Sequence, residues 1–209
     1  MNGLKKIMDG IKELMNELFQ GVEENGNAYR SMAEHLGVTG VGAIVEAVLT
    51  GGINKEMPYP VLHFHVTLAR NVPEAAEQNI YRSLNELNNV ISVGEYPSFG
   101  NFAYYPRLRQ IYLSYRLPLN AETPEAELIN IKYYLEVLYE QLDLFADFII
   151  FLCDNDGRMV PMEEYIDYLS QLSDINDIEE RIDLLLEKLK IAGFGAESPE
   201  SGSEEAGRL

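Results

Sequence analysis

The chain has 209 residues, 46% of them hydrophobic and 10% aromatic, so it can fill a core and wholesale disorder is excluded. Its formal net charge of −18 argues against nucleic acid as a partner, because the phosphate backbone would be repelled. The same charge argues against docking on an anionic membrane surface and leaves neutral or basic partners.

The first 50 residues are predicted to hold two helices and a third segment that could be a strand or a helix. Residues 4–19 read as an amphipathic helix, because apolar side chains recur at spacings of three and four. A shorter helix is expected over residues 28–36, ending at Gly37. Residues 41–49 fit either a strand or a short helix. A strand is slightly favoured, because it would give the strand that follows a hairpin partner.

The middle of the chain alternates between strand and helix periods. Residues 61–70 read as a strand with His63 and His65 on one face. Residues 74–90 read as a helix that buries Ile80, Leu84, Leu87 and Ile91. A hairpin is then expected, with strands over residues 99–104 and 108–117 on either side of a Tyr-Pro-Arg turn.

A long helix over residues 124–152 has the strongest periodic pattern in the chain. Beside its main apolar stripe runs a second stripe, formed by Tyr134, Tyr139, Phe148 and Phe151. One stripe is enough to cover a sheet, so the second predicts that another helix or another subunit packs there. Helices are also expected over residues 162–172 and 175–191.

This order of elements predicts an α+β fold, in which an antiparallel sheet is flanked by helices and extra helices stand at both ends of the chain. The predicted organisation has four parts: an N-terminal helical extension (1–37), the α+β core (38–153), an acidic helical extension packing on the core (154–192) and a disordered tail (193–209). The apolar run after Lys5 and Lys6 is broken at once, so no secretory signal is visible. With a single cysteine in the chain, the expected location is the cytoplasm.

Two side-chain patterns resemble metal sites. His63 and His65 share a strand face, but a site needs a third ligand, which the sequence does not identify. The other reading is a solvent-facing strand with two polar side chains. Residues 154–157 resemble part of a calcium loop, yet Leu152 would stand at the first ligand position and cannot coordinate. This segment is therefore interpreted as an acidic turn between helices.

The predicted hairpin carries several tyrosines and arginines in a chain with only 16 basic residues. Tyrosine and arginine dominate the energetics of many protein interfaces, although tyrosine is also an ordinary strand former. The hairpin and the spare stripe of the long helix are the predicted protein-binding surfaces, with the residues Tyr104, Arg109, Tyr112, Arg116, Tyr134 and Phe148. No catalytic motif is visible, so neither an enzyme nor a cofactor is expected.

The segment from about residue 61 to residue 152 resembles the YbjN family, within the superfamily shaped like type III secretion chaperones. The resemblance rests on Leu84-Asn85-Glu86-Leu87-Asn88-Asn89, on Gly94, and on Ile111-Tyr112-Leu113-Ser114-Tyr115-Arg116-Leu117-Pro118-Leu119 before the long helix. It implies a compact antiparallel sheet with flanking helices, often in a homodimer, that holds a segment of another protein or regulates it.

The expected function is therefore that of a non-enzymatic, chaperone-like or adaptor protein that binds another protein or a peptide and forms a homodimer. Strand addition at a sheet edge and a helix groove are two possible modes of binding. One alternative is a metal-dependent enzyme or metal-binding regulator built on His63 and His65. Another is a structural interaction module of a larger assembly.

Overall fold

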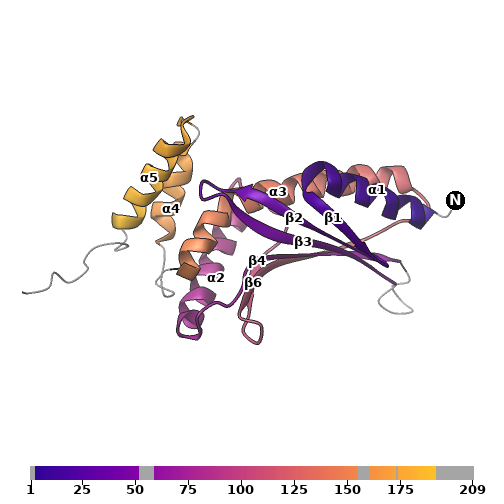
Figure 1. Ribbon diagram of the computed structural model, residues 1–209, viewed down its shortest axis with the longest axis horizontal. Helices are drawn as coiled ribbons and strands as arrows, with labels where there is room; N and C mark the ends of the chain where they lie inside the picture. Colours follow the sequence, from indigo (N-terminus) through magenta and orange to yellow (C-terminus); the bar gives the residue numbers. More distant parts are fainter. Residues whose placement is uncertain (1–2, 52–58, 155–160, 173, 192–209) are drawn as a thin grey trace, which may run out of the picture. The chain divides into compact units, whose positions relative to one another are not determined.

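The computed structural model describes residues 3–51, 59–154, 161–172 and 174–191 (Figure 1). The chain divides into two compact units, Met1–Met162 and Glu163–Leu209. The first unit holds an N-terminal helix, six strands and two further helices. Their bounds are α1 (Gly3–Leu18), β1 (Gln20–Asn25), β2 (Ala28–Leu36), β3 (Val41–Thr50), β4 (Val61–Ala69), a 3-10 turn η1 (Glu74–Ala76), α2 (Glu77–Val93), β5 (Phe102–Tyr105), β6 (Gln110–Pro118) and α3 (Pro124–Asp154).

The six strands form one antiparallel sheet in the order β1-β2-β3-β4-β6-β5. This confirms the predicted α+β class. Residues 41–49 lie within β3, so the favoured strand assignment is also confirmed. Helix α2 buries the four predicted residues Ile80, Leu84, Leu87 and Ile91.

The helix predicted over residues 28–36 is wrong, because this segment is strand β2. Gly26 has a φ of 63° and, with Asn27, forms the two-residue loop of a hairpin that joins β1 to β2. Tyr29 and Ala33 are buried, whereas Arg30 and Met32 between them are exposed, which is the two-residue period of a strand. Residues 1–37 are therefore not a helical extension, since β1 and β2 belong to the sheet of the core.

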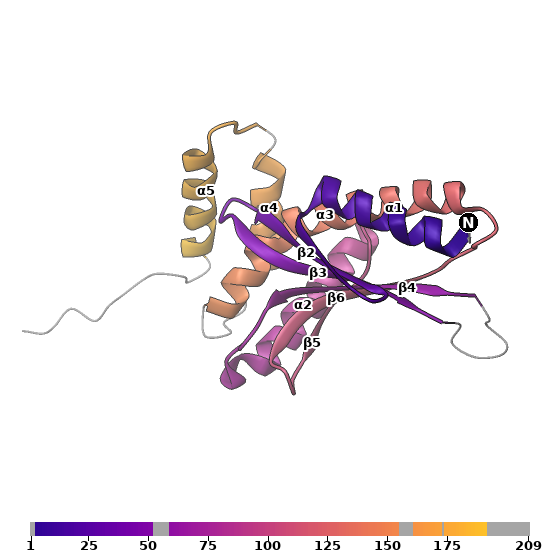
Figure 2. The same cartoon turned by 45° about the vertical axis from the view of Figure 1, so that its right-hand side comes forward.

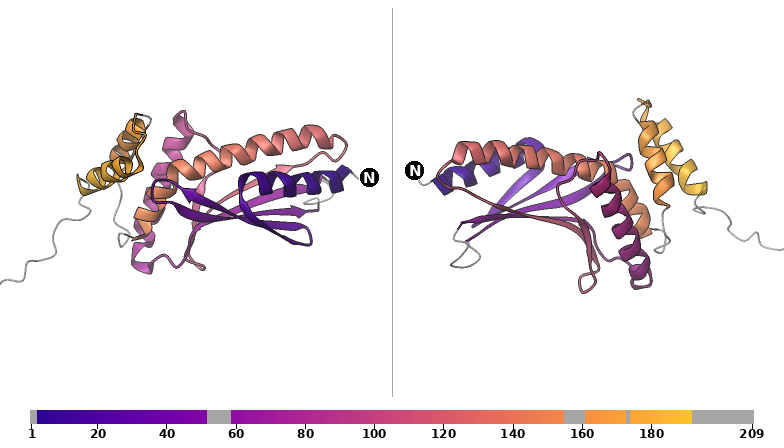
Figure 3. Two further views of the ribbon diagram at one scale, coloured as in Figure 1. Left: turned by 45° about the horizontal axis from the view of Figure 1, so that its top comes forward. Right: turned by 180° about the vertical axis from the view of Figure 1, so that it is seen from behind.

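Helices α1, α2 and α3 all lie on one face of the sheet (Figures 1 and 3). Helices α1 and α3 run side by side across β1 to β4, and α2 packs against β5 (Figures 2 and 3). Gly10 permits the close approach of α1 to α3, because a Cβ atom there would lie 2.5 Å from Leu128 Cδ2. The core lies between these helices and the covered face of the sheet, where Phe64 and Val66 are fully buried.

The second stripe of α3 is covered in part within the same chain. The ring of Tyr139 lies 6.4 Å from that of Phe19, which follows α1, and Phe148 is fully buried. Ion pairs of Lys6 with Glu125 and of Lys132 with Glu17 also join α1 to α3. Near Tyr139 the neighbouring layer is therefore α1 of the same chain, and Phe148 is already buried without a second subunit.

The second unit contains α4 (Met162–Leu172) and α5 (Ile178–Ile191). Helix α5 begins three residues later than predicted because Asp177 caps it: its Oδ1 accepts hydrogen bonds from the Glu179 and Glu180 amides. Lys188 of α5 pairs with Asp167 of α4. The predicted tail (193–209) and most of the calcium-like segment (155–157) lie outside the described residues.

Candidate functional site

The face of the sheet opposite α1, α2 and α3 is the candidate functional site, and we call it the open face. The register of β4 and β6 places His63 opposite Arg116, His65 opposite Ser114 and Thr67 opposite Tyr112. Strands β2 and β3 extend this face with side chains from alternate positions. They are Arg30, Met32, Ile44, Glu46 and Val48.

Three rings form a cluster at the centre of the open face. The His65 and Tyr112 rings stack with their centroids 5.0 Å apart, and the His63 ring lies edge-on 6.2 Å from that of His65. His63 Nε2 is 2.8 Å from Ser114 Oγ, at hydrogen-bonding distance. The cluster therefore combines flat apolar surface with polar groups that accept or donate hydrogen bonds.

The setting of His63 favours its neutral form. Burial lowers the pKa of His63 below 6.5, and the nearby charges of Arg116 and His65 lower it further. Among the described residues, no group of three or more metal-ligating side chains lies close enough to hold an ion. The described part of the chain thus gives the two histidines a hydrogen-bond partner and a stacking partner but no third ligand.

The open face has a hollow towards each side. A hollow of about 250 Å³ is lined by Thr50, Gly51, Val61, His63 and Arg116. A second one, of about 300 Å³, lies towards β1, and its walls include Arg30, Met32 and Ile44. The same surface is apolar at Ile44 and Val48, and Arg30 and Glu46 form a loose ion pair at 3.9 Å.

The edge of the sheet at β5 is closed by a side chain. Asn88 of α2 accepts a hydrogen bond from the Phe102 amide and donates one to the Phe102 carbonyl, each at 2.9 Å. The Asn88 amide thus occupies the backbone groups that an added strand would need. Strand addition at β5 is blocked at this residue.

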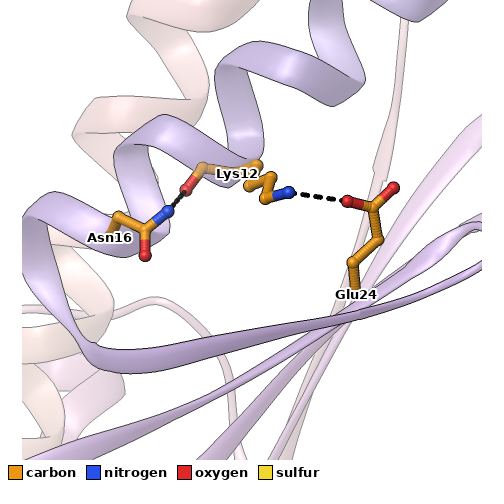
Figure 4. A network of polar contacts seen from close by, with 3 residues as sticks. All are labelled: Lys12, Asn16 and Glu24. Atoms are coloured by element: carbon orange, nitrogen blue, oxygen red, sulfur yellow. Dashed lines mark hydrogen bonds and ion pairs between the residues drawn. The ribbon is translucent and has the colours of Figure 1, made fainter.

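The edge at β1 is protected in another way. Its pairing with β2 is irregular between Gln20 and Glu23, and irregular, charged edge strands discourage pairing with other chains. Lys12 of α1 forms a 2.7 Å ion pair with Glu24 of β1, and Asn16 donates to the Lys12 carbonyl (Figure 4). The sheet is therefore better suited to contact a partner through its open face than through its edges.

The predicted binding residues lie in three places: on the open face, on the covered side of the sheet, and in the turn between β5 and β6. Tyr112 and Arg116 lie on the open face beside His63, as the alternation of β6 predicts. Tyr104 points to the covered side, where its ring meets Tyr81 of α2 at 5.4 Å.

Arg109 stands in the turn between β5 and β6 with a φ of 46°, and its carbonyl accepts a hydrogen bond from the Val72 amide. Tyr134 is half-buried on α3, and its ring lies 5.6 Å from that of Tyr115. Phe148 is fully buried and serves the core, so we do not retain it as a binding residue.

The apolar part of the open face was missed from the sequence. The sequence predicts a helix at Met32, and it fits either a strand or a helix at Ile44 and Val48. The signal that would have found them is the two-residue alternation of residues 28–36 read together with residues 41–48 as a hairpin.

Comparison with known proteins does not supply a family for this chain. No protein-family model matches the sequence, and no curated protein matches it. Within the described residues, no helix has both the length and the apolar character needed to cross a membrane.

Proposed function

We propose that this protein is a non-enzymatic, chaperone-like or adaptor protein that binds a segment of another protein across its open face. The observation that carries the proposal is the juxtaposition of His63, His65, Tyr112 and Arg116 beside the apolar residues of β2 and β3. A face that mixes aromatic rings, arginines and apolar side chains has the composition of a protein interface.

The protected sheet edges support the same mode of binding. Asn88 blocks β5 at Phe102, and β1 is irregular and acidic, so both edges of the sheet disfavour pairing with another strand. The resemblance of residues 61–152 to the YbjN family implies the same class of function. The cytoplasm is the compartment that we propose for it.

The proposal is tested by placing a photo-crosslinking amino acid at single positions in the native cell. Met32 and Arg116 report on the open face, and Val93, which is 88% exposed at the end of α2, is the matched control. We expect discrete adducts of the same mass from both open-face positions and none from Val93. Adding Tyr112→Ala is expected to remove the adducts while the melting temperature stays within a few degrees, since Tyr112 is half-buried.

Adducts from Val93 alone, or adducts that persist with Tyr112→Ala, would contradict this assignment of the face. An adduct of twice the chain mass would identify the partner as a second copy. In that case sedimentation velocity is expected to show a dimer that Arg116→Glu dissociates, because the substitution reverses a charge on the contact surface.

A further inference from the structure

A further hollow, of about 410 Å³, lies between α3 and the loop that joins α2 to β5. We call it the tyrosine pocket. Its walls combine aromatic rings and carboxylates, with no basic side chain among the residues that line it. The residues with this character are Glu95, Tyr96, Tyr133, Tyr134, Glu136 and Glu140.

The rings of the pocket are held in place from behind. The Tyr134 ring lies 5.6 Å from that of Tyr115 and 6.3 Å edge-on from that of Phe99. The Tyr96 ring lies 5.6 Å edge-on from the buried ring of Phe145. Two walls are thus anchored to the core, so little side-chain entropy remains to be lost when a ligand binds.

Tyr133 completes the aromatic surface from the solvent side. Its ring is edge-on to that of Tyr134, with centroids 5.9 Å apart, and the side chain is 63% exposed. A large aromatic ring left in water beside two fixed rings offers apolar area that a ligand can cover.

The carboxylates of the pocket lack a counter-charge. Among the described residues, none of Glu95, Glu136 and Glu140 takes part in an ion pair. Glu136 and Glu140 stand four residues apart on α3, where like charges repel each other. A cation placed in the pocket would relieve this repulsion and would face three tyrosine rings, whose π-surfaces attract positive charge.

We propose that the tyrosine pocket binds the charged end of a lysine or arginine side chain presented by a protein partner. The net charge of −18 favours the approach of such a basic segment over long range. The pocket is distinct from the open face, because Tyr134 lies on α3 against the covered side of the sheet. This inference therefore goes beyond the proposed function, and either can fail alone.

The test is an NMR titration of the full chain carrying labelled tyrosine. The ligand probes are Nα-acetyl-lysine methylamide and Nα-acetyl-arginine methylamide, and Nα-acetyl-norleucine methylamide is the uncharged control. We expect saturable shifts of Tyr96, Tyr133 and Tyr134 with the two cations and no saturation with norleucine. Raising the salt concentration is expected to weaken binding, because the carboxylates are exposed to solvent.

Variants separate the contributions of ring and charge. Glu136→Gln combined with Glu140→Gln is expected to weaken binding about tenfold, and Tyr133→Ala about two- to fivefold. Glu13→Gln, an exposed charge removal on α1, is expected to leave the affinity unchanged. All the changes are at exposed positions, so thermal unfolding is expected to show folded proteins with nearly unchanged melting temperatures.

Three results would overturn the proposal. Equal tyrosine shifts with the norleucine probe would show that the hollow binds apolar side chains and does not recognise the positive charge. Equal weakening by Glu13→Gln would assign the effect to net charge rather than to the pocket. Shifts of the three tyrosines that depend on protein concentration without any probe would assign the pocket to contacts between copies of the chain.

Discussion

On the open face, His63 is held where its neutral ring is favoured over the charged one. Burial and the charges of Arg116 and His65 all lower the pKa of His63 below 6.5. Between the lowered pKa and 6.5, the unfolded chain binds more protons at this site than the folded chain does. The free energy of unfolding therefore falls as the pH drops through this window.

Replacing His63 with glutamine is expected to remove this loss. Urea unfolding at pH values between about 7 and about 5 measures the unfolding free energy of the wild type and of His63→Gln. As the pH falls, the wild type is expected to lose more stability than the variant. An NMR titration of the His63 ring protons provides the independent check. A titration midpoint at or above 6.5 would contradict the expected direction.

For single residues, the sequence predicts which side chains share a strand face but not which face the helices cover. His63, His65, Tyr112 and Arg116 come together because two strands with a two-residue period pair in register. Tyr104 belongs to the same hairpin yet faces α2, because the side that a helix covers depends on the path of the chain after the strand. Phe148 sits in a stripe that looks spare in the sequence, yet its side chain is fully buried in the core.

Among the elements, the turn between β2 and β3 is fastened to α3 by two aspartates one helical turn apart. Asp147 is 2% exposed and accepts hydrogen bonds from the Val38 and Thr39 amides and from the Thr39 hydroxyl. Asp143 is exposed and accepts one hydrogen bond, from the Gly37 amide. In the sequence both residues look only like interruptions of an apolar run.

Removing Asp147 is expected to cost far more stability than removing Asp143. Asp147→Ala leaves two backbone amides of a part-buried turn without an acceptor, which costs about 2 to 3 kcal/mol. Asp143→Ala is the matched control and should cost less than about 1 kcal/mol, because water replaces its exposed bond. Equal losses for the two variants in urea unfolding would show that the docked turn does not depend on Asp147.

Helices and strands with an unbroken hydrophobic period are predictable from the sequence. A strand that is stabilised only by pairing with neighbouring strands is not. The long stripe of α3 and the alternation of β4 each specify one structure from local spacing. Strand β2 mixes Ala, Met, Glu and Leu, which are good helix formers, so its propensity points the wrong way. Pairing on both sides, with β1 and with β3, overrides that preference.

For the whole molecule, charge repulsion opposes folding. The chain carries 34 acidic and 16 basic residues, and the ion pairs among the described residues involve mostly solvent-exposed side chains. Exposed pairs of this kind contribute little, whereas a net charge of −18 repels itself in the compact state. Screening by salt weakens both the repulsion among the acidic side chains and the attraction within the ion pairs. We therefore expect salt to stabilise the folded state, because the repulsion is the larger of the two effects.

Raising sodium chloride from about 0.02 M to about 0.5 M is expected to raise the urea midpoint, because the screening length falls from about 20 Å to a few ångströms. The comparison uses urea because guanidinium would itself change the ionic strength. Sucrose at matched osmolality is the control for general exclusion effects. A midpoint that falls with salt would mean that the ion pairs outweigh the repulsion.

The amide of Asn88 that seals β5 also bears on how copies of this protein behave when they are crowded together. A sheet with an unpaired edge is a template on which a second sheet can continue the ladder, and repetition of that step builds fibres. By pairing the Phe102 backbone with a side chain of its own helix, the chain ends the ladder at this residue. Pairing of copies along the sheet is therefore opposed at this residue of β5, which favours particles of finite size.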